Sequence, residues 1–379
     1  MLLALIAAAW PHGATFGALQ VAVSRDDPDE MWVLTEGWGL AHTTDGGGAW
    51  DWLCEEALGG EALYGVVATG PGAAIVASRS GLRTVGGDCG TGVIPGTEGV
   101  FFPAVAAYGG VVLGLGIGEA EGGVWTCDAT GCAPTDLAGP GLFPKSALAD
   151  GARAWVTVVY EGTLAAELWR SDDGTAWTRV HAWPDGDTDP RVLHADGDHL
   201  LVWRRTRAEA DVPELLVSND GGATFTSTLQ HGWYTDDAPG LLVLDDALLL
   251  GSVAGARTWR SEDRGATWAE VSAEVPAVRC GDSVEVDGAR VGFACGDHLQ
   301  DGFDLSRTDD GRTWVPVACL EDALPAACAD DACGSLLASW QTAGSYGGGK
   351  CDTVIEPPRP LHPPEGPCGC GDGGAAGLV

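Results

Sequence analysis

Basic residues are scarce in this sequence of 379 residues, and lysine occurs only twice, at Lys145 and Lys350. The chain has 20 lysines and arginines against 54 acidic residues, which gives a formal net charge of −34. Binding to a phosphate backbone needs basic side chains, and an acidic surface repels both nucleic acid and anionic lipid. The composition therefore argues against nucleic acid as a partner. It favours a soluble protein, cationic partners or Ca²⁺.

Long apolar runs are also missing, because no stretch reaches the roughly 20 apolar residues of a membrane-spanning helix. The run over residues 2–9 (LLALIAAA) is short and is followed by Trp10-Pro11. Such a run is typical of a signal peptide, although no lysine or arginine precedes it. We predict a signal peptide over residues 1–14 and a secreted or outer-surface location. Export would allow the twelve cysteines to form disulfides.

The 58 glycines, set among short apolar runs, indicate many tight turns and an all-β protein. One motif recurs, with the pattern hydroxyl, x, Asp, x, Gly, x, Thr or Ala, aromatic. Three copies begin at Thr43, Ser218 and Ser261, two without the first hydroxyl begin at Asp172 and Asp309, and worn copies lie at Asp128 and Asp88. The structural residues of the five clear copies are Asp45, Trp50, Asp172, Trp177, Asp220, Phe225, Asp263, Trp268, Asp309 and Trp314.

Successive anchor aspartates are 40 to 48 residues apart, a period that suits one four-stranded blade of a β-propeller. The flanking apolar runs place the motif at the turn between the third and fourth strands of each blade. We predict seven blades of four antiparallel strands over residues 18–319. Residues 320–356 are either strands that close the ring or a decayed eighth blade, so eight blades remain an alternative.

The motif resembles the Asp-box (BNR) repeat of sialidases, sortilin-type receptors, some xyloglucanases and the photosystem II assembly factor family. The resemblance implies a propeller whose boxes lie at the periphery, away from the central site. It does not imply catalysis. A sialidase usually has an Arg-Ile-Pro motif before its first box, and none occurs here.

Three cysteine pairings are predicted, one from strand register and two from local spacing. Pairing across the hairpin turn Asp287-Gly288 places Cys280 opposite Cys295. Cys127 and Cys132, like Cys328 and Cys333, flank four residues and are predicted to bridge short loops. Six cysteines stay unassigned: Cys54, Cys89, Cys319, Cys351, Cys368 and Cys370. Zinc is the alternative, but no cysteine and histidine spacing matches a zinc finger or ribbon.

Residues 357–379 begin with a proline-rich stretch, which predicts a stiff stalk, and continue with Cys368-Gly-Cys370-Gly. This tail resembles the start of the sorting signals of myxobacterial surface proteins, which implies surface anchoring through the C-terminus. The apolar helix and basic cluster of such signals do not follow here. The alternative is a disordered tail with a disulfide or free thiols.

Long connections on the face opposite the Asp-box turns carry the residues that we predict to bind a ligand, between the fourth and sixth blades. They are His181, Trp183, Arg205, Arg207, Trp233 and Tyr234. Aromatic rings stack on sugars and arginines grip carboxylates, and long loops on rigid scaffolds concentrate function. Asp185, Asp187 and Asp189 alternate in a way that could bind Ca²⁺, but the bidentate Glu and the rest of an EF-hand are missing, which favours an ordinary solvated turn.

The sequence thus predicts a non-catalytic recognition or scaffold module, most simply a monomer, that binds glycans or polypeptides. The alternative is a glycoside hydrolase that uses a pair of carboxylates in the central funnel. With 54 acidic residues, the sequence cannot nominate that pair. It predicts no cofactor apart from the Ca²⁺ alternative.

Overall fold

The computed structural model describes residues 18–35, 37–118, 121–128, 130–151, 153–183, 188–206, 212–230, 239–252, 257–296, 301–320 and 323–336. The predicted signal peptide and the tail over residues 357–379 lie outside these ranges. Among the described residues, no helix has the length and apolar character needed to cross a membrane.

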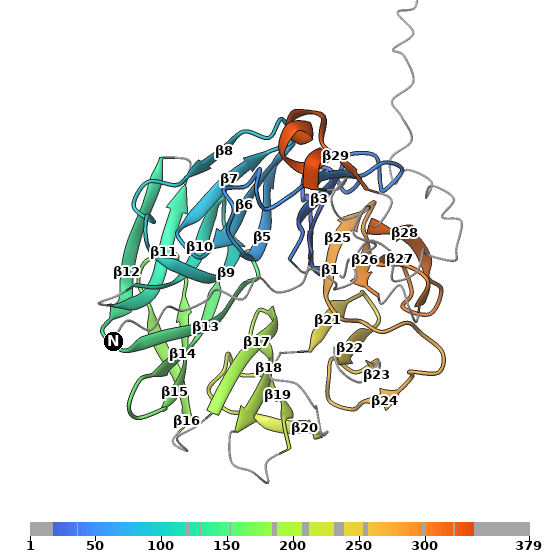
Figure 1. The fold of residues 1–379 in the computed structure, drawn as a ribbon. Helices are drawn as coiled ribbons and strands as arrows, with labels where there is room; N and C mark the ends of the chain where they lie inside the picture. The colour runs from blue at the N-terminus through green and yellow to red at the C-terminus, as the bar shows by residue number, and fades with distance from the viewer. Residues whose placement is uncertain are drawn as a thin grey trace, which may run out of the picture.

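Seven antiparallel sheets of four consecutive strands are arranged around a ring (Figure 1). The first strand of each sheet lies nearest the centre and the fourth strand lies outside. This arrangement confirms the predicted all-β propeller with seven blades.

Each blade is formed by one continuous stretch of chain. Blades 1 to 4 consist of β1 (Ala18–Val23), β2 (Met31–Thr35), β3 (Gly39–Thr43) and β4 (Asp51–Leu53); β5 (Leu63–Gly70), β6 (Ala73–Ser78), β7 (Leu82–Gly86) and β8 (Thr91–Val93); β9 (Phe101–Tyr108), β10 (Val111–Ile117), β11 (Gly122–Asp128) and β12 (Gly131–Gly139); β13 (Leu142–Ala149), β14 (Ala154–Tyr160), β15 (Ala166–Ser171) and β16 (Thr178–Trp183). Blades 5 to 7 consist of β17 (Thr188–Asp196), β18 (His199–Thr206), β19 (Glu214–Ser218) and β20 (Thr226–Gln230); β21 (Gly240–Val243), β22 (Leu248–Ser252), β23 (Arg257–Ser261) and β24 (Ala269–Glu270); β25 (Gly281–Val286), β26 (Ala289–Cys295), β27 (Leu305–Thr308) and β28 (Val315–Ala318).

Position within a blade explains the sequence of each strand. Every residue of β2 and β3 is buried, because neighbouring blades cover both faces of these middle strands. Such strands are mostly apolar, although β3 also buries His42 and Thr43. The outer strand β20 has no fully buried residue and is rich in threonine and serine. The core is therefore divided among the seams between blades, as the separate buried clusters show.

The ring closes where blade 7 meets blade 1. The backbone N–H of Val23 donates to Asp282 Oδ2 at 2.9 Å, and the guanidinium of Arg25 lies 3.3 Å from Asp282 Oδ1. Cys54 and Phe293 belong to the same buried cluster, which extends across this seam. Side-chain packing and these polar contacts join the first and last blades.

The chain after blade 7 forms neither a closing inner strand nor an eighth blade in its described part. The short strand β29 (Leu324–Pro325) pairs in parallel with β4, outside blade 1, and is followed by a 3₁₀-helix η2 (Ala327–Ala329) and a π-helix η3 (Asp330–Gly334). We call residues 323–336 the strap. In Figure 1 the strap, drawn in red, lies against blades 1 and 2.

Four disulfides connect described residues. Cys280–Cys295 and Cys127–Cys132 are present, which confirms both pairings. The predicted Cys328–Cys333 bridge is wrong, because Cys333 is bonded to Cys54 and Cys328 to Cys89. The strap runs along the outside of blades 1 and 2, so its two cysteines meet partners 279 and 239 residues earlier in the chain rather than each other. Cys319 is also disulfide-bonded.

The turns between the third and fourth strands of blades 1, 4, 5, 6 and 7 share one hydrogen-bond pattern. In blade 5, the Ser218 hydroxyl donates to Asp220 Oδ1 at 2.8 Å and accepts from the N–H of Gly222 at 2.9 Å. Asp220 also accepts from the N–H of Thr224 at 2.9 Å. Gly222 has a φ of +91°, and a Cβ there would lie 2.7 Å from the Leu168 side chain of blade 4. Glycine is thus required by both backbone conformation and close packing.

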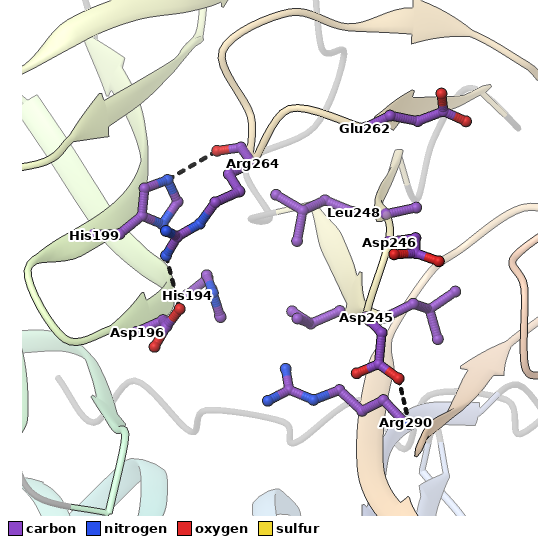
Figure 2. Close-up of a pocket in the computed structure, with 12 residues that line it drawn as sticks. His194, Asp196, His199, Asp245, Asp246, Leu248, Glu262, Arg264 and Arg290 are labelled. Carbon is purple, nitrogen blue, oxygen red and sulfur yellow. Dashed lines mark hydrogen bonds and ion pairs between the residues drawn. The ribbon is translucent and has the colours of Figure 1, made fainter. Parts of the chain in front are cut away.

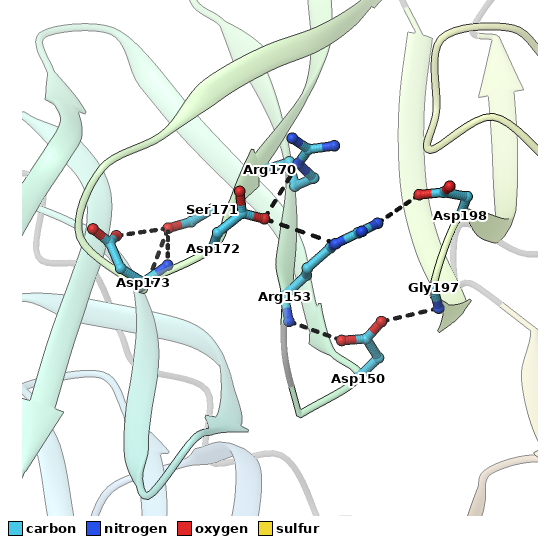
Figure 3. A network of polar contacts seen from close by, with 9 residues as sticks. Asp150, Arg153, Arg170, Ser171, Asp172, Asp173, Gly197 and Asp198 are labelled. Carbon is cyan, nitrogen blue, oxygen red and sulfur yellow. Dashed lines mark hydrogen bonds and ion pairs between the residues drawn. The ribbon is translucent and has the colours of Figure 1, made fainter.

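Two of these turns are one residue shorter than the others. As a result, the aspartate that accepts the hydrogen bonds of the turn is Asp173 rather than the predicted Asp172, and Asp310 rather than the predicted Asp309. In blade 4 the hydroxyl of Ser171 donates to Asp173, and Asp173 accepts from the N–H groups of Thr175 and Ala176 at 2.8 Å (Figure 3). Asp172 instead points toward Arg153 and Arg170. In blade 7, Asp310 likewise has this role in place of Asp309, since it accepts from the N–H of Thr313 at 2.7 Å.

Candidate functional site

Two of the residues predicted to bind a ligand lie in an aromatic cluster on the outer side of blades 4 and 5. The His181 and Phe225 rings are 5.0 Å apart, and the Trp183 and Phe225 rings are 5.6 Å apart. Trp183 is only 3% exposed, and His181 Nδ1 lies 3.2 Å from the carbonyl oxygen of Ala223. Both side chains therefore pack the seam between blade 4 and the turn of blade 5.

The other predicted residues divide between described and undescribed parts of the chain. Arg205 and Asp189 are cross-strand neighbours on β18 and β17. Asp189 lies 3.7 Å from Lys145 Nζ and 3.5 Å from the guanidinium of Arg191. The remaining predicted residues, which lie outside the described ranges, are Arg207, Trp233, Tyr234, Asp185 and Asp187.

Within the ranges that the structure describes, no group of three or more histidine, cysteine, aspartate or glutamate side chains is placed to hold a metal ion. Only Asp189 of the proposed Ca²⁺ ligands lies in those ranges, and cationic side chains surround it. A Ca²⁺ site at residues 185–189 therefore stays a prediction.

A pocket of about 310 Å³ lies on the face of the ring that carries the short turns, opposite the face predicted to bind a ligand (Figure 2). We call it the turn-face pocket. The β17–β18 hairpin of blade 5 contributes one wall, the β21–β22 turn and the 262–264 turn of blade 6 contribute a second, and β26 of blade 7 closes it. Its polar lining residues are His194, Asp196, His199, Asp245, Asp246, Glu262, Arg264 and Arg290.

Hydrogen bonds hold these side chains across the seams between blades. His199 Nε2 donates to the carbonyl oxygen of Arg264 at 2.8 Å, and the guanidinium of Arg264 pairs with Asp196 at 2.7 Å (Figure 2). The N–H of Arg290 donates to Asp245 Oδ2 at 2.9 Å. Blade 5 is thus connected to blade 6, and blade 6 to blade 7.

The two histidines are kept neutral. Burial lowers the pKa of His194 to about 4, and the neighbouring His199 ring, 6.0 Å away, lowers it further in the same direction. Burial, followed by the charge of Arg264, also lowers the pKa of His199. Because Nε2 of His199 carries the proton, Nδ1 is an acceptor. It is buried and has no hydrogen-bond partner among the described residues.

The pocket therefore presents donors and acceptors of both signs in a small volume. Arg264 and Arg290 offer donors, Asp246 and Glu262 offer acceptors, and Leu248 adds an apolar surface. A volume of this size is at the lower limit for small-ligand sites. The lining suits a ligand with many hydroxyl, amide or paired charged groups.

Reasoning from the sequence missed this pocket because it favoured long connections over short turns. The turn-face pocket is made by turns of three blades that are each short. Its sequence signal was the pair His194 and His199, which flank the turn Asp196-Gly197-Asp198 and follow apolar positions in β17. Only the ring arrangement brings Arg264 and Arg290 to these histidines.

No protein-family model matches the chain, and no curated protein matches it. Among solved structures, a chain of hydrazine synthase from Kuenenia stuttgartiensis is similar with a TM-score of 0.56 and 12% identity over 79% of this chain and 97% of that chain. The match to YCF48 from Cyanidioschyzon merolae has a TM-score of 0.48 and 15% identity, and it covers 74% of this chain and 92% of that chain. The match to the GH74 enzyme of Niastella koreensis has a TM-score of 0.42 and 12% identity, and it covers 80% of this chain and 66% of that enzyme. This chain therefore spans just under two thirds of that enzyme's length. At these identities the likeness to hydrazine synthase shows the propeller fold alone.

Proposed function

We propose that this chain is an exported, non-catalytic propeller that binds a polar ligand, a glycan or a polypeptide, in the turn-face pocket. The observation that carries the proposal is the set of polar contacts that joins three blades in this pocket, one ion pair and one backbone hydrogen bond. Asp196 is held by Arg264, and Asp245 is held by the backbone of Arg290. Paired side chains keep a fixed arrangement of donors and acceptors, which favours recognition.

Export is supported by the disulfides. Four of them lie in the described part of the chain, and disulfides form and persist mainly in oxidising compartments. The apolar run over residues 2–9 adds a feature of signal peptides. Mass spectrometry of the protein recovered outside the cell would test export by locating its first residue.

A binding screen with a glycan panel and a peptide library tests the proposed recognition. We expect retention without turnover for the wild type. Arg264→Ala and Arg290→Ala should each weaken binding about tenfold, because each removes a donor from the pocket. Arg264→Ala leaves the carbonyl oxygen that accepts from His199 in place, so the pocket wall stays intact.

Arg179→Ala is the matched control, since Arg179 pairs with Glu167 inside blade 4 and does not line the pocket. Released product that disappears after a single Asp or Glu change would replace the proposal with the hydrolase alternative. Unchanged binding in both pocket variants would move the site away from the turn face.

The loops on the opposite face are the second possible location of the same activity. The length of these connections in the sequence favours them. Of their predicted residues, Arg205 lies in β18, and Arg207, Trp233 and Tyr234 lie outside the described ranges. Trp233→Ala and Arg205→Ala, tested with the same ligand and with melting curves, would distinguish the two faces. Lost binding with unchanged melting would favour the loops.

A further inference from the structure

A second hollow, of about 640 Å³, lies at the outer edge of the ring between blades 6 and 7. We call it the rim groove. Blade 6 contributes Arg260, Trp268 and the chain after β24, and the turn of blade 7 contributes the opposite wall. The lining residues are Arg260, Glu262, Thr267, Trp268, Ala269, Val271, Glu274, Val275, Gly311 and Arg312.

The outer strand of blade 6 is the shortest of the seven outer strands that the structure describes. β24 has two residues, whereas β16 and β20 have six and five. After Glu270 the chain turns away, and the N–H of Val271 donates to the carbonyl oxygen of Thr258 at 2.8 Å. The Thr258 hydroxyl donates to the carbonyl oxygen of Pro276 at 3.0 Å, which fixes residues 271–276 as a wall. The hollow is therefore built by hydrogen-bonded backbone.

The charges in the groove compensate one another. Glu262 accepts from Arg260 Nε at 3.1 Å and from the guanidinium of Arg312 at 2.9 Å. Arg260 also donates to the carbonyl oxygen of Asp310 at 3.0 Å. The hydrogen bonds that Glu262 accepts from Arg260 and Arg312 lower its pKa, and the bond from Arg260 has the larger effect. The result is a set of planar polar groups without a net excess of positive charge.

An aromatic ring stands beside these polar groups. The half-buried indole of Trp268 lines the groove, and its Nε1 donates to the carbonyl oxygen of Gly265 at 2.9 Å. This bond fixes the orientation of the ring. A fixed aromatic face together with planar donors and acceptors suits the apolar and hydroxyl faces of a sugar ring.

The rim groove and the turn-face pocket flank a single turn. Glu262 lines both hollows, Arg264 lies in the turn-face pocket, and Thr267 and Trp268 lie in the rim groove. Residues 262–268 thus form a ridge between the two hollows. A ligand made of repeated units could occupy both hollows by crossing this ridge.

We propose that the rim groove binds a neutral oligosaccharide, and that one sugar chain extends across residues 262–268 from the turn-face pocket to the rim groove. The inference rests on the proposed recognition function and names its ligand class. A neutral ligand fits because both arginines are already paired with Glu262, and because a protein of net charge −34 repels anionic glycans.

Calorimetric titration with cello-, xylo- and manno-oligosaccharides of two to six units tests the proposal. Affinity for the matching series should rise about tenfold or more between two and six units. Trp268→Phe, which keeps an aromatic side chain in the seam, and Arg312→Ala should remove most of that gain. Arg179→Ala, again the control, should leave the length dependence unchanged because Arg179 lines neither hollow.

The outcomes separate the two proposals. If six-unit sugars bind equally well to wild type, Trp268→Phe and Arg312→Ala, the rim groove is not part of the site, while recognition itself stands. If peptides bind and no neutral sugar does, the assigned ligand class is wrong and the recognition function survives. If neither class binds the folded protein, both proposals fail.

Discussion

Blades 1 and 2 contrast with blades 5 to 7 in how their outer edges are treated. At blade 1 the strap adds a fifth strand to the sheet, and the disulfides Cys54–Cys333 and Cys89–Cys328 attach it to the chain after β4 and to the β7–β8 turn. At blade 6 the outer strand stops after two residues and leaves the rim groove open. One sector of the ring is covered and cross-linked, and another is hollowed and lined by polar groups.

Buried polar contacts reinforce the covered sector. Glu30, which is 2% exposed, accepts from Trp32 Nε1 and from the N–H of Gly72 in blade 2. Such a satisfied buried carboxylate holds two blades in a fixed relation. In the hollowed sector, by contrast, the side chains of Glu262, Arg264 and Arg312 are exposed. The comparison shows that cross-links and a buried carboxylate gather in blades 1 and 2, whereas the polar hollows lie in blades 5 to 7.

Removing both strap disulfides should have the largest effect. Replacing Cys54, Cys89, Cys328 and Cys333 with alanine releases links between segments more than 200 residues apart. We expect a loss of roughly 5 kcal/mol in the free energy of unfolding, measured with urea, because long loops gain most entropy when a cross-link is removed.

The control is Cys127→Ala with Cys132→Ala, which opens a bridge between residues only five apart and should cost about 2 kcal/mol. If the four-cysteine variant is too unstable to purify, Cys89→Ala with Cys328→Ala gives the same comparison at a smaller loss. Equal losses at the strap and in blade 3 would show that the strap does not hold the ring together.

Acid should weaken the hollowed sector through His194. Its pKa in the folded protein is about 4, below its value of 6.5 without burial, so the unfolded chain takes up a proton that the folded chain resists. This contribution is fully present above about pH 6.5 and is lost as the pH falls toward 4. It should amount to something on the order of 2 kcal/mol.

Urea unfolding of wild type and His194→Gln at pH 7 and pH 4.5 measures the effect. The many carboxylates act equally in both proteins, so the difference isolates the histidine. A variant whose stability falls as steeply with acid as that of the wild type would contradict this assignment.

Asp173→Ala should lower the melting temperature by a few degrees, whereas Asp172→Ala should leave it nearly unchanged. Hydrogen bonds from Ala176 and Thr175 lower the pKa of Asp173 to about 2, so this carboxylate is integral to its turn. Asp172 is 66% exposed and makes only ion pairs, and such pairs contribute little. The reverse order of effects would restore Asp172 as the anchor.

The smallest effect is expected at the seam that closes the ring. Arg25 is 69% exposed in its pair with Asp282, so Arg25→Ala should change the free energy of unfolding by less than about 1 kcal/mol. A larger loss in urea titration would mean that this surface pair shares the closing role assigned to the strap.

The architecture could be predicted from the sequence because each blade is a local object. The spacing of the motif predicted the number of blades, and the strand register around Asp287-Gly288 predicted the disulfide Cys280–Cys295. The same local reasoning failed for Cys328 and Cys333, since nothing in their spacing indicates where the chain runs after the last blade. A one-residue shortening likewise hid the roles of Asp173 and Asp310, which only hydrogen bonds reveal.

The candidate site was harder to predict for a related reason. His199 and Arg264 are 65 residues apart and meet only because blades 5 and 6 are neighbours in the ring. His181 and Trp183 have the composition of a binding surface, yet they lie where the outer strand of blade 4 packs on the turn of blade 5. Composition identified candidate residues, and the geometry of the seams decided which of them meet.

The way the ring is closed also has an evolutionary consequence. Each of the seven blades takes its four consecutive strands from one unbroken stretch of chain, and the strap adds only the short strand β29 to the outer edge of blade 1. A gene duplication or deletion of one repeat would therefore add or remove a whole blade without dividing a sheet. The strap would need only to reach a new first blade, so a lineage with this design can change its blade number in single steps.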